Sequence, residues 1–399
     1  MSDDFASGLR ELLDERGVSQ GALARRIPCD RALICRYARG KQQPSAKMAS
    51  RIDEILDAGG RLMALAGPRR RAVLAGIAAA AAGPTLFGAL DERDRLAWTE
   101  RHPSRIDTAV VASLADALAA QRRTDDALGS AAMIKPVMAQ LAVVENLATE
   151  ARGPVRHAVI DVAMQWCQFA AWLHLSARDF PTARALWRQT LELATEAGDA
   201  TMTTTVLHNR AYMAYLAGEP GPLVGLASAA QRDLSANASE RALGAALEAR
   251  GHAMTGDGDA TERALGAALD MAGQRQPGRW SYWATPQYLD CERGVALGYL
   301  AHIDRYRAQA FDALTAGYQS LGADLSGSEW GAMYLLHRAA VHVRGGDVGE
   351  ACADAMQAIP VARQTNSASL AGMLAQLHAG LSARYPRDPR VAELAEALA

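Results

Sequence analysis

The chain has 399 residues, of which 50% are hydrophobic but only 6% are aromatic. This length exceeds what one small helical core can organise, so we expect one small domain joined to one large or repetitive domain. Ala, Leu, Arg and Glu dominate the composition, which favours helix throughout and argues against a fold built on sheets.

The net charge of −2 conceals two regions of opposite charge. Residues 1–72 hold 14 Lys and Arg against 9 Asp and Glu, which is a net charge of +5, whereas the remainder carries −7. A basic head joined to an acidic body suits a phosphate-binding head whose body does not compete for nucleic acid. The charge pattern therefore points to the first domain as the candidate nucleic-acid-binding part.

Four short helices are predicted in the first 66 residues. Apolar side chains recur at helical spacing in each of them, and a glycine or proline ends each of them. The first predicted helix begins at Phe5 and ends at Gly17, and the second is capped by Ser19 and ends before Pro28. The third runs from Asp30 to about Ala38, and the fourth from Pro44 to Gly59. Four such helices form a compact bundle, and we assign it to residues 1–66.

The segment Val18–Ser45 resembles the helix-turn-helix of phage-repressor and xenobiotic-response-element (XRE) regulators. The likeness lies in its Ser-Gln start, the Leu23-Ala24 packing pair, the buried Ile34, and the Arg-Gly-Lys exit that is followed by Pro44. It covers about residues 5–57. The turn departs from the family pattern, because it carries Pro28 and Cys29 where glycine is usual. The resemblance implies a DNA-binding, cytoplasmic transcription regulator.

The third predicted helix must send one face into the bundle and another into the major groove of DNA. Ile34 and Tyr37 supply the inward face. The expected base-reading residues are Arg31, Ala32, Leu33 and Arg36, since arginine can bond guanine and a small apolar group can meet a thymine methyl. The expected phosphate contacts are Gln20, Arg39, Lys41 and Gln43. Because one such module reads few base pairs, we expect a homodimer on an inverted-repeat operator in double-stranded DNA.

Residues 67–90 are predicted to connect the two domains, because Gly67-Pro68 and Gly83-Pro84 delimit them. Three arginines followed by the apolar run Ala72–Gly83 resemble a twin-arginine export signal. This run follows a complete domain and is too short for a membrane span, so we expect a buried or linker helix and no membrane. Membrane attachment through Ala72–Leu90 is the alternative.

Residues 91–399 read as helices separated by short turns, each marked by an acidic residue. The markers are Asp179, Glu219, Asp257, Asp304 and Asp347, at steps of 40, 38, 47 and 43 residues. A period near 40 residues corresponds to one helix pair per unit, and such a unit must stack on its neighbours to bury its apolar face. The predicted fold is therefore all-α, with an α-solenoid behind the helix-turn-helix bundle.

The body is similar to tetratricopeptide (TPR) repeats at Asp179–Trp187, where Ala183 lets two helices approach and Trp187 fills a groove. This segment, together with Thr124–Gly129 and Trp166–Trp172, makes the body similar to that of the long regulators of actinobacterial type. In related peptide-sensing regulators, the concave side of the solenoid holds a signalling peptide. The resemblance thus implies a site for a signalling peptide, a small molecule or a protein partner, with candidate contacts at Gln165, Asn209, Arg210 and Tyr212. The stripe of Trp166, Phe169, Ala170 and Leu173 favours helix-pair core instead.

No motif in the sequence indicates an enzyme, a cofactor or a metal site. Phosphate-binding glycine motifs, HExxH and a nucleophile elbow are missing, and the histidines lack the spacing of metal ligands. The five cysteines have neither CxxC nor Cys/His spacing, which fits a reducing cytoplasm. Two functions stay open: a ligand-responsive DNA-binding regulator, and a protein-interaction scaffold that the head locates on DNA. The first requires a deep polar-lined channel, and the second a shallower apolar face.

Overall fold

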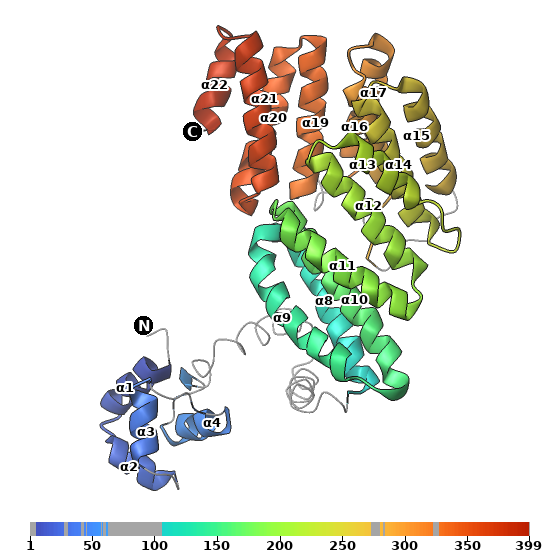
Figure 1. Ribbon diagram of the computed structural model, residues 1–399. Helices are drawn as coiled ribbons and strands as arrows, with labels where there is room; N and C mark the ends of the chain where they lie inside the picture. The colour runs from blue at the N-terminus through green and yellow to red at the C-terminus, as the bar shows by residue number, and fades with distance from the viewer. Residues whose placement is uncertain are drawn as a thin grey trace. The chain divides into compact units, whose positions relative to one another are not determined.

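The computed structural model describes residues 5–27, 31–40, 44, 46–56, 58, 61–62, 106–272, 280–281, 284–321 and 327–398. The chain divides into two units, Met1–Gly83 and Pro84–Ala399. Within the described residues every regular element is a helix, as the composition predicts (Figure 1). The predicted connector, residues 67–90, lies outside the described residues, so its helix and its limits stay predictions.

The first unit contains the four predicted short helices: α1 (Phe5–Glu15), α2 (Gln20–Arg26), α3 (Arg31–Ala38) and α4 (Ala46–Ile55). Their apolar spacing places one side chain per turn in a shared core, which includes Phe5, Leu9, Leu12, Leu23, Ile34 and Ile52. Ser19 caps α2 as predicted, because its hydroxyl accepts a hydrogen bond from the Ala22 backbone N–H at 3.1 Å. The cap expected at Asp30 lies outside the described residues.

The second unit is a succession of stacked helix pairs, which can be followed in Figure 1 from cyan at the bottom, through yellow at the upper right, to red at the upper left. The helices are α8 (Thr108–Leu128), α9 (Ser130–Glu150), α10 (Arg156–Ser176), α11 (Phe180–Ala197), α12 (Ala200–Leu216), α13 (Pro220–Ala229), α14 (Ala238–Met254), α15 (Gly258–Ala272), α16 (Pro286–Tyr299), α17 (Asp304–Gln319), α19 (Glu329–Gly345), α20 (Val348–Thr365), α21 (Ala368–Arg384) and α22 (Pro389–Leu398), with a short 3₁₀ turn at Gly153–Val155. The predicted α-solenoid is therefore confirmed.

Each predicted acidic marker stands where the second helix of a pair begins. The carboxylates of Asp179, Asp257 and Asp347 accept a hydrogen bond from the backbone N–H three residues later. Glu219 occupies the same position before α13 without a side-chain cap, and Asp304 is the first residue of α17. These caps start the second helix at a fixed place, so the period near 40 residues records the length of one helix pair.

The helices of a pair pack closely where small residues face each other. Ala183 and Trp187 of α11 are both fully buried, as the TPR-like stretch predicts. Gly294 of α16 and Gly317 of α17 allow the closest approach, since a methyl group on either would come within about 3 Å of backbone atoms of the partner helix. Such contacts give each group of neighbouring helices its own core, and these cores follow one another along the stack.

The two ends of the solenoid contact each other. The Ser369 hydroxyl, at the start of α21, donates to the Ser176 carbonyl at 3.1 Å, and the Arg178 Nε donates to the Ser369 oxygen at 3.1 Å. Arg178 has a φ of 63°, where three of the equivalent turns have glycine. Its guanidinium also donates to the Leu216 carbonyl at 3.3 Å. The stack of repeats therefore curls far enough to enclose space on its concave side.

Candidate functional site

The recognition helix predicted from the sequence is α3. Ile34 and Tyr37 are buried in the core of the first unit, which confirms the inward face, and Arg36 is exposed. Leu33 is half-buried and packs against that core, so less of it is available to a base than predicted. Arg31 and Ala32 belong to the first turn of α3, but their side chains lie outside the described residues.

Two of the four predicted phosphate-binding residues lie at the ends of these helices. Gln20 is the first residue of α2 and is half-buried, and Arg39 directly follows α3 and is exposed. Lys41 and Gln43 lie outside the described residues. Amide groups and cations at helix termini are the groups that hold DNA phosphates. Gln20 and Arg39 thus lie at helix ends, and the exposed Arg36 lies on the same helix that Arg39 follows.

The second candidate site is a cavity of about 120 Å³ on the concave side of the solenoid. Side chains from α8, α10, α12, α14, α16 and α19, together with Trp280 from the segment before α16, form its wall. The aromatic members are Phe169, Trp172, Tyr212, Trp280, Tyr288, Trp330 and Tyr334. The charged members are Arg122, Asp125, Asp126, Glu240, Arg250 and Glu292. The cavity therefore has a mainly apolar, aromatic wall in which several charged groups are set.

Two of the four predicted ligand-contacting residues line this cavity: Asn209 and Tyr212, which are one helical turn apart on α12. Arg210 is not among the lining residues, because the next position on a helix points about 100° away. Gln165 is also not among them, and its amide donates to the Asp161 carboxylate at 3.3 Å. The stripe expected to be core is buried, although Phe169 also reaches the cavity.

A buried ion pair between Arg250 of α14 and Glu292 of α16 stands at the centre of the wall. Tyr334 of α19 donates its hydroxyl to the other oxygen of Glu292 at 2.8 Å, and the Arg250 guanidinium lies 4.4 Å from the centre of the Tyr215 ring. Burial alone would lower the pKa of Arg250, but Glu292 raises it, so the guanidinium stays charged. The pair therefore joins four helices, including α12 through Tyr215, at one point.

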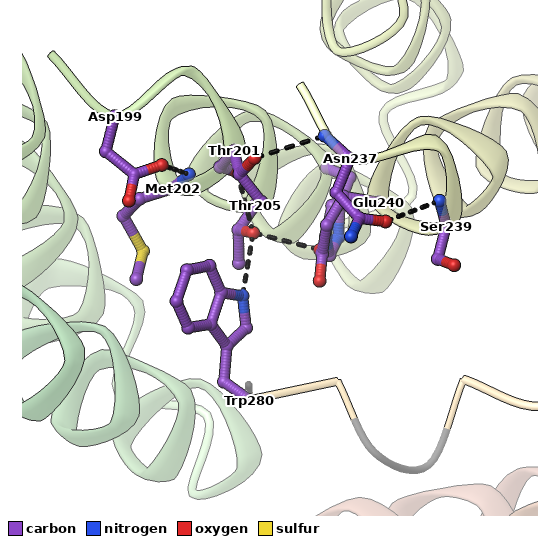
Figure 2. A network of polar contacts seen from close by, with 9 residues as sticks. Asp199, Thr201, Met202, Thr205, Asn237, Ser239, Glu240 and Trp280 are labelled. Atoms are coloured by element: carbon purple, nitrogen blue, oxygen red, sulfur yellow. Dashed lines mark hydrogen bonds and ion pairs between the residues drawn. The ribbon is translucent and has the colours of Figure 1, made fainter. Parts of the chain in front are cut away.

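A second network fixes the position of Trp280 (Figure 2). The indole N–H of Trp280 donates to the Thr205 hydroxyl oxygen at 3.0 Å, and that hydroxyl donates to Glu240 at 2.9 Å. His208 Nε2 lies 2.7 Å from the same Glu240 oxygen. Burial by itself would raise the pKa of Glu240, but the hydrogen bond and charge of His208 lower it below its usual value. His208 and Thr205 thus hold one oxygen of the Glu240 carboxylate, whereas the other, Oε1, is buried and has no hydrogen-bond partner among the described residues.

The carboxylate of Asp125, on the acidic side of the cavity, is paired with no cation of the two networks above. Asp125 accepts a hydrogen bond from the Ser130 hydroxyl at 2.9 Å. Burial raises the pKa of Asp125 to about 7; the Ser130 hydrogen bond lowers it, and the neighbouring carboxylates of Asp126 and Glu329 raise it. Burial also raises the pKa of Glu329. The negative charge at Asp125 is therefore poorly compensated.

Two further polar groups of the wall are uncharged. Burial, together with the charges of Arg250 and Arg344, lowers the pKa of His337 to about 3, so its imidazole is neutral at pH 7. Asn209 is 5% exposed, and its side-chain N–H₂ has no hydrogen-bond partner among the described residues. A buried donor without an acceptor costs free energy, and a molecule in the cavity could supply that acceptor.

The described residues contain neither a candidate metal site nor a candidate membrane span. In that part of the chain, no group of three or more His, Cys, Asp or Glu side chains could hold a metal ion. None of the described helices is long and apolar enough to span a bilayer. The alternative anchor, Ala72–Leu90, lies outside the described residues.

Residues 4–66 match the family model of a helix-turn-helix domain. A comparison with curated proteins gives no match. Among solved structures, the crystal structure of yeast Tom70 is similar, with 13% sequence identity and a TM-score of 0.37 over 99% of this chain and 85% of that chain. The chain thus carries an N-terminal helix-turn-helix domain and, behind it, an all-helical repeat solenoid.

Proposed function

We propose that the chain is a sequence-specific, DNA-binding transcription regulator of the XRE type, and that its solenoid senses a ligand. The match of residues 4–66 to a helix-turn-helix domain carries this proposal. The exposure of Arg36 and Arg39 on and after α3, whose opposite face is buried, supports it. In this proposal Arg36 reads a base, Arg39 and Gln20 hold phosphates, and the protein works in the cytoplasm without a catalytic role.

The regulator acts as a homodimer on an inverted repeat in this proposal. A single helix-turn-helix reads too few base pairs to find one site in a genome, and two heads placed one DNA turn apart restore the required specificity. Arg31, Ala32, Lys41 and Gln43 complete the proposed DNA-contacting set, with the first two reading bases and the last two holding phosphates.

The cavity supports a receptor role for the solenoid over a scaffold role. A scaffold that docks another protein would present a broad apolar surface. Here the concave side instead encloses a space lined by aromatic rings and by buried, hydrogen-bonded charges such as Glu240 and Arg250. Convergent polar groups in an aromatic cavity are typical of small-ligand sites.

Alanine substitutions separate the proposed base contact from the proposed phosphate contact. On the preferred operator, Arg36→Ala is expected to lose about 1–3 kcal/mol of binding free energy and to relax sequence preference. Arg39→Ala is expected to weaken operator and random duplex alike and to reduce the salt slope by about one. Fluorescence anisotropy with both duplexes at several salt concentrations measures these effects.

The control is Arg10→Ala, which removes the same charge from α1, where Arg10 bonds Ser7 and the Ala6 carbonyl. It is expected to leave DNA affinity within about twofold of the parent chain. If Arg36→Ala weakened operator and random duplex by the same factor, the base-reading role of Arg36 would be wrong. If all three variants bound like the parent, α3 would not be the DNA-binding helix.

A further inference from the structure

The size of the cavity limits what it can hold. Its volume of about 120 Å³ is close to that of an engineered protein cavity of about 150 Å³ that accommodates one benzene molecule. An adjoining hollow of about 40 Å³ shares Asp125, Trp172 and Trp330 with it. Together these spaces suit one small molecule, about as large as an aromatic ring with a short substituent, rather than an extended peptide.

The aromatic walls favour a flat or cationic ligand. Trp172 and Tyr212 are stacked with ring centroids 6.1 Å apart, and Trp330 meets Tyr288 edge-on at 6.0 Å. These rings come from four helices and converge on one space, in a chain that is only 6% aromatic. Ring faces attract another ring, and they also attract a cation within about 6 Å of their centroids.

The charge of the wall selects between a cation and an anion. Carboxylates outnumber guanidinium groups among the lining residues. Arg250 is already paired with Glu292. The Oε2 atom of Glu240 contacts His208 and Thr205, whereas its Oε1 atom has no hydrogen-bond partner among the described residues. Asp125 instead has a hydroxyl as its hydrogen-bond partner and carboxylates as strong charged neighbours. A bound cation would relieve this repulsion, whereas an anion would increase it.

Asn209 adds a requirement for a ligand oxygen. Its buried N–H₂ has no acceptor within the described part of the chain and faces the same cavity. A hydroxyl or carbonyl oxygen on the ligand would satisfy this donor and remove the cost of leaving it unpaired.

We infer that the cavity binds a small organic cation, in which an aromatic ring carries a protonated amine and a neighbouring hydroxyl or carbonyl oxygen. The ring lies among Trp172, Tyr212 and Trp330, the amine faces Asp125, and the oxygen accepts from Asn209. This inference specifies the ligand class for the sensory role proposed above and rests on that role, but its test does not depend on DNA binding.

Three probes that share a phenyl ring and a hydroxyl test the inference: 2-amino-1-phenylethanol, which is cationic; 1-phenyl-1,2-ethanediol, which is neutral; and mandelate, which is anionic. Calorimetric titration of the full chain without DNA at pH 8 is expected to show saturable binding of the amine. The diol is expected to bind about 10- to 100-fold more weakly, because it carries no positive charge to pair with the Asp125 carboxylate, and mandelate more weakly still.

Variants locate the bound amine. Asp125→Asn is expected to weaken binding of the amine about 10- to 100-fold and to weaken binding of the neutral diol much less. The matched control, Asp312→Asn, removes an exposed carboxylate from α17 and is expected to change neither. The inference would be overturned if mandelate bound as tightly as the amine or if none of the probes bound. It would also be overturned if Asp125→Asn and Asp312→Asn had equal effects on binding of the amine.

A further titration distinguishes a small-molecule amine from the N-terminal amine of a peptide. The tripeptide Phe-Gly-Gly is expected to bind more weakly than 2-amino-1-phenylethanol, because the cavity is too small for its backbone, and tighter binding of the tripeptide would overturn the small-molecule assignment. If the amine binds as expected while operator binding is not found, the DNA-binding proposal fails by itself. If the operator is bound while no probe is, the ligand inference fails by itself.

Discussion

Replacing Arg250 with alanine is expected to lower the free energy of unfolding of the second unit by about 3–5 kcal/mol. Arg250 is 2% exposed, and its removal leaves the buried Glu292 carboxylate without its cation. The Tyr334 hydroxyl remains to donate to Glu292, but one neutral hydrogen bond does not compensate for a buried charge. Urea unfolding followed by tryptophan fluorescence reports this unit, because the first tryptophan of the chain is Trp98.

Two comparisons show whether the loss arises from the unpaired charge. Arg305→Ala breaks the exposed Arg305–Glu262 pair, whose side chains are 62% and 51% exposed, and is expected to cost less than about 1 kcal/mol. The double variant Arg250→Met with Glu292→Gln removes both charges and is expected to recover much of the stability lost in Arg250→Ala. If Arg250→Ala cost no more than Arg305→Ala, the ion pair would not hold the cavity wall together.

Replacing Asp125 with asparagine is expected to stabilise the second unit at pH 8 and to leave its stability at pH 4 nearly unchanged. The folded state raises the pKa of Asp125 from 3.8 to about 7, so between these values the folded state binds more protons at this residue than the unfolded state. Stability contributed by this group is therefore present below about pH 4 and is lost as the pH rises to about 7. One pKa unit corresponds to about 1.4 kcal/mol, so the gain at pH 8 is at most about 4 kcal/mol.

Urea midpoints of the parent chain, Asp125→Asn and Asp312→Asn at pH 4, 6 and 8 measure this effect. Asparagine retains an oxygen that can accept from the Ser130 hydroxyl, so the comparison isolates the charge. Asp312→Asn is expected to follow the parent chain at every pH. A stability difference between Asp125→Asn and the parent that does not change with pH would show that Asp125 does not titrate in this range.

Local signals in the sequence were sufficient to predict the four short helices of the first unit and the repeated helix pairs of the second. Ser19, Asp179 and Asp347 begin helices because a side-chain oxygen close to the backbone N–H groups of a first turn is a local arrangement. The repeat period follows from the same caps. The inward residues Ile34 and Tyr37 follow from helical spacing alone, which is why the face of α3 could be predicted.

The cavity depends on how the repeats curve, which the sequence does not reveal by local pattern. Arg250 and Glu292 are 42 residues apart, and charged residues of this kind are rarely buried without a partner, so each looks exposed when read singly. The contact of Ser369 with Ser176 spans 193 residues and arises from the summed rotation of all intervening helix pairs. Asn209 and Tyr212 could be proposed as ligand contacts, whereas Trp280 and Trp330 could not.

The central claim is that the chain recognises a specific DNA sequence, and selection from a random duplex library with the purified full chain tests it most directly. We expect repeated selection to enrich an inverted repeat whose half-site centres lie about one helical turn, roughly 10 base pairs, or a multiple of it, apart. We also expect the enriched duplex to bind at least about 1,000-fold more tightly than a scrambled one at physiological salt. Failure to enrich any motif, with equal affinity for enriched and scrambled duplexes, would contradict the claim.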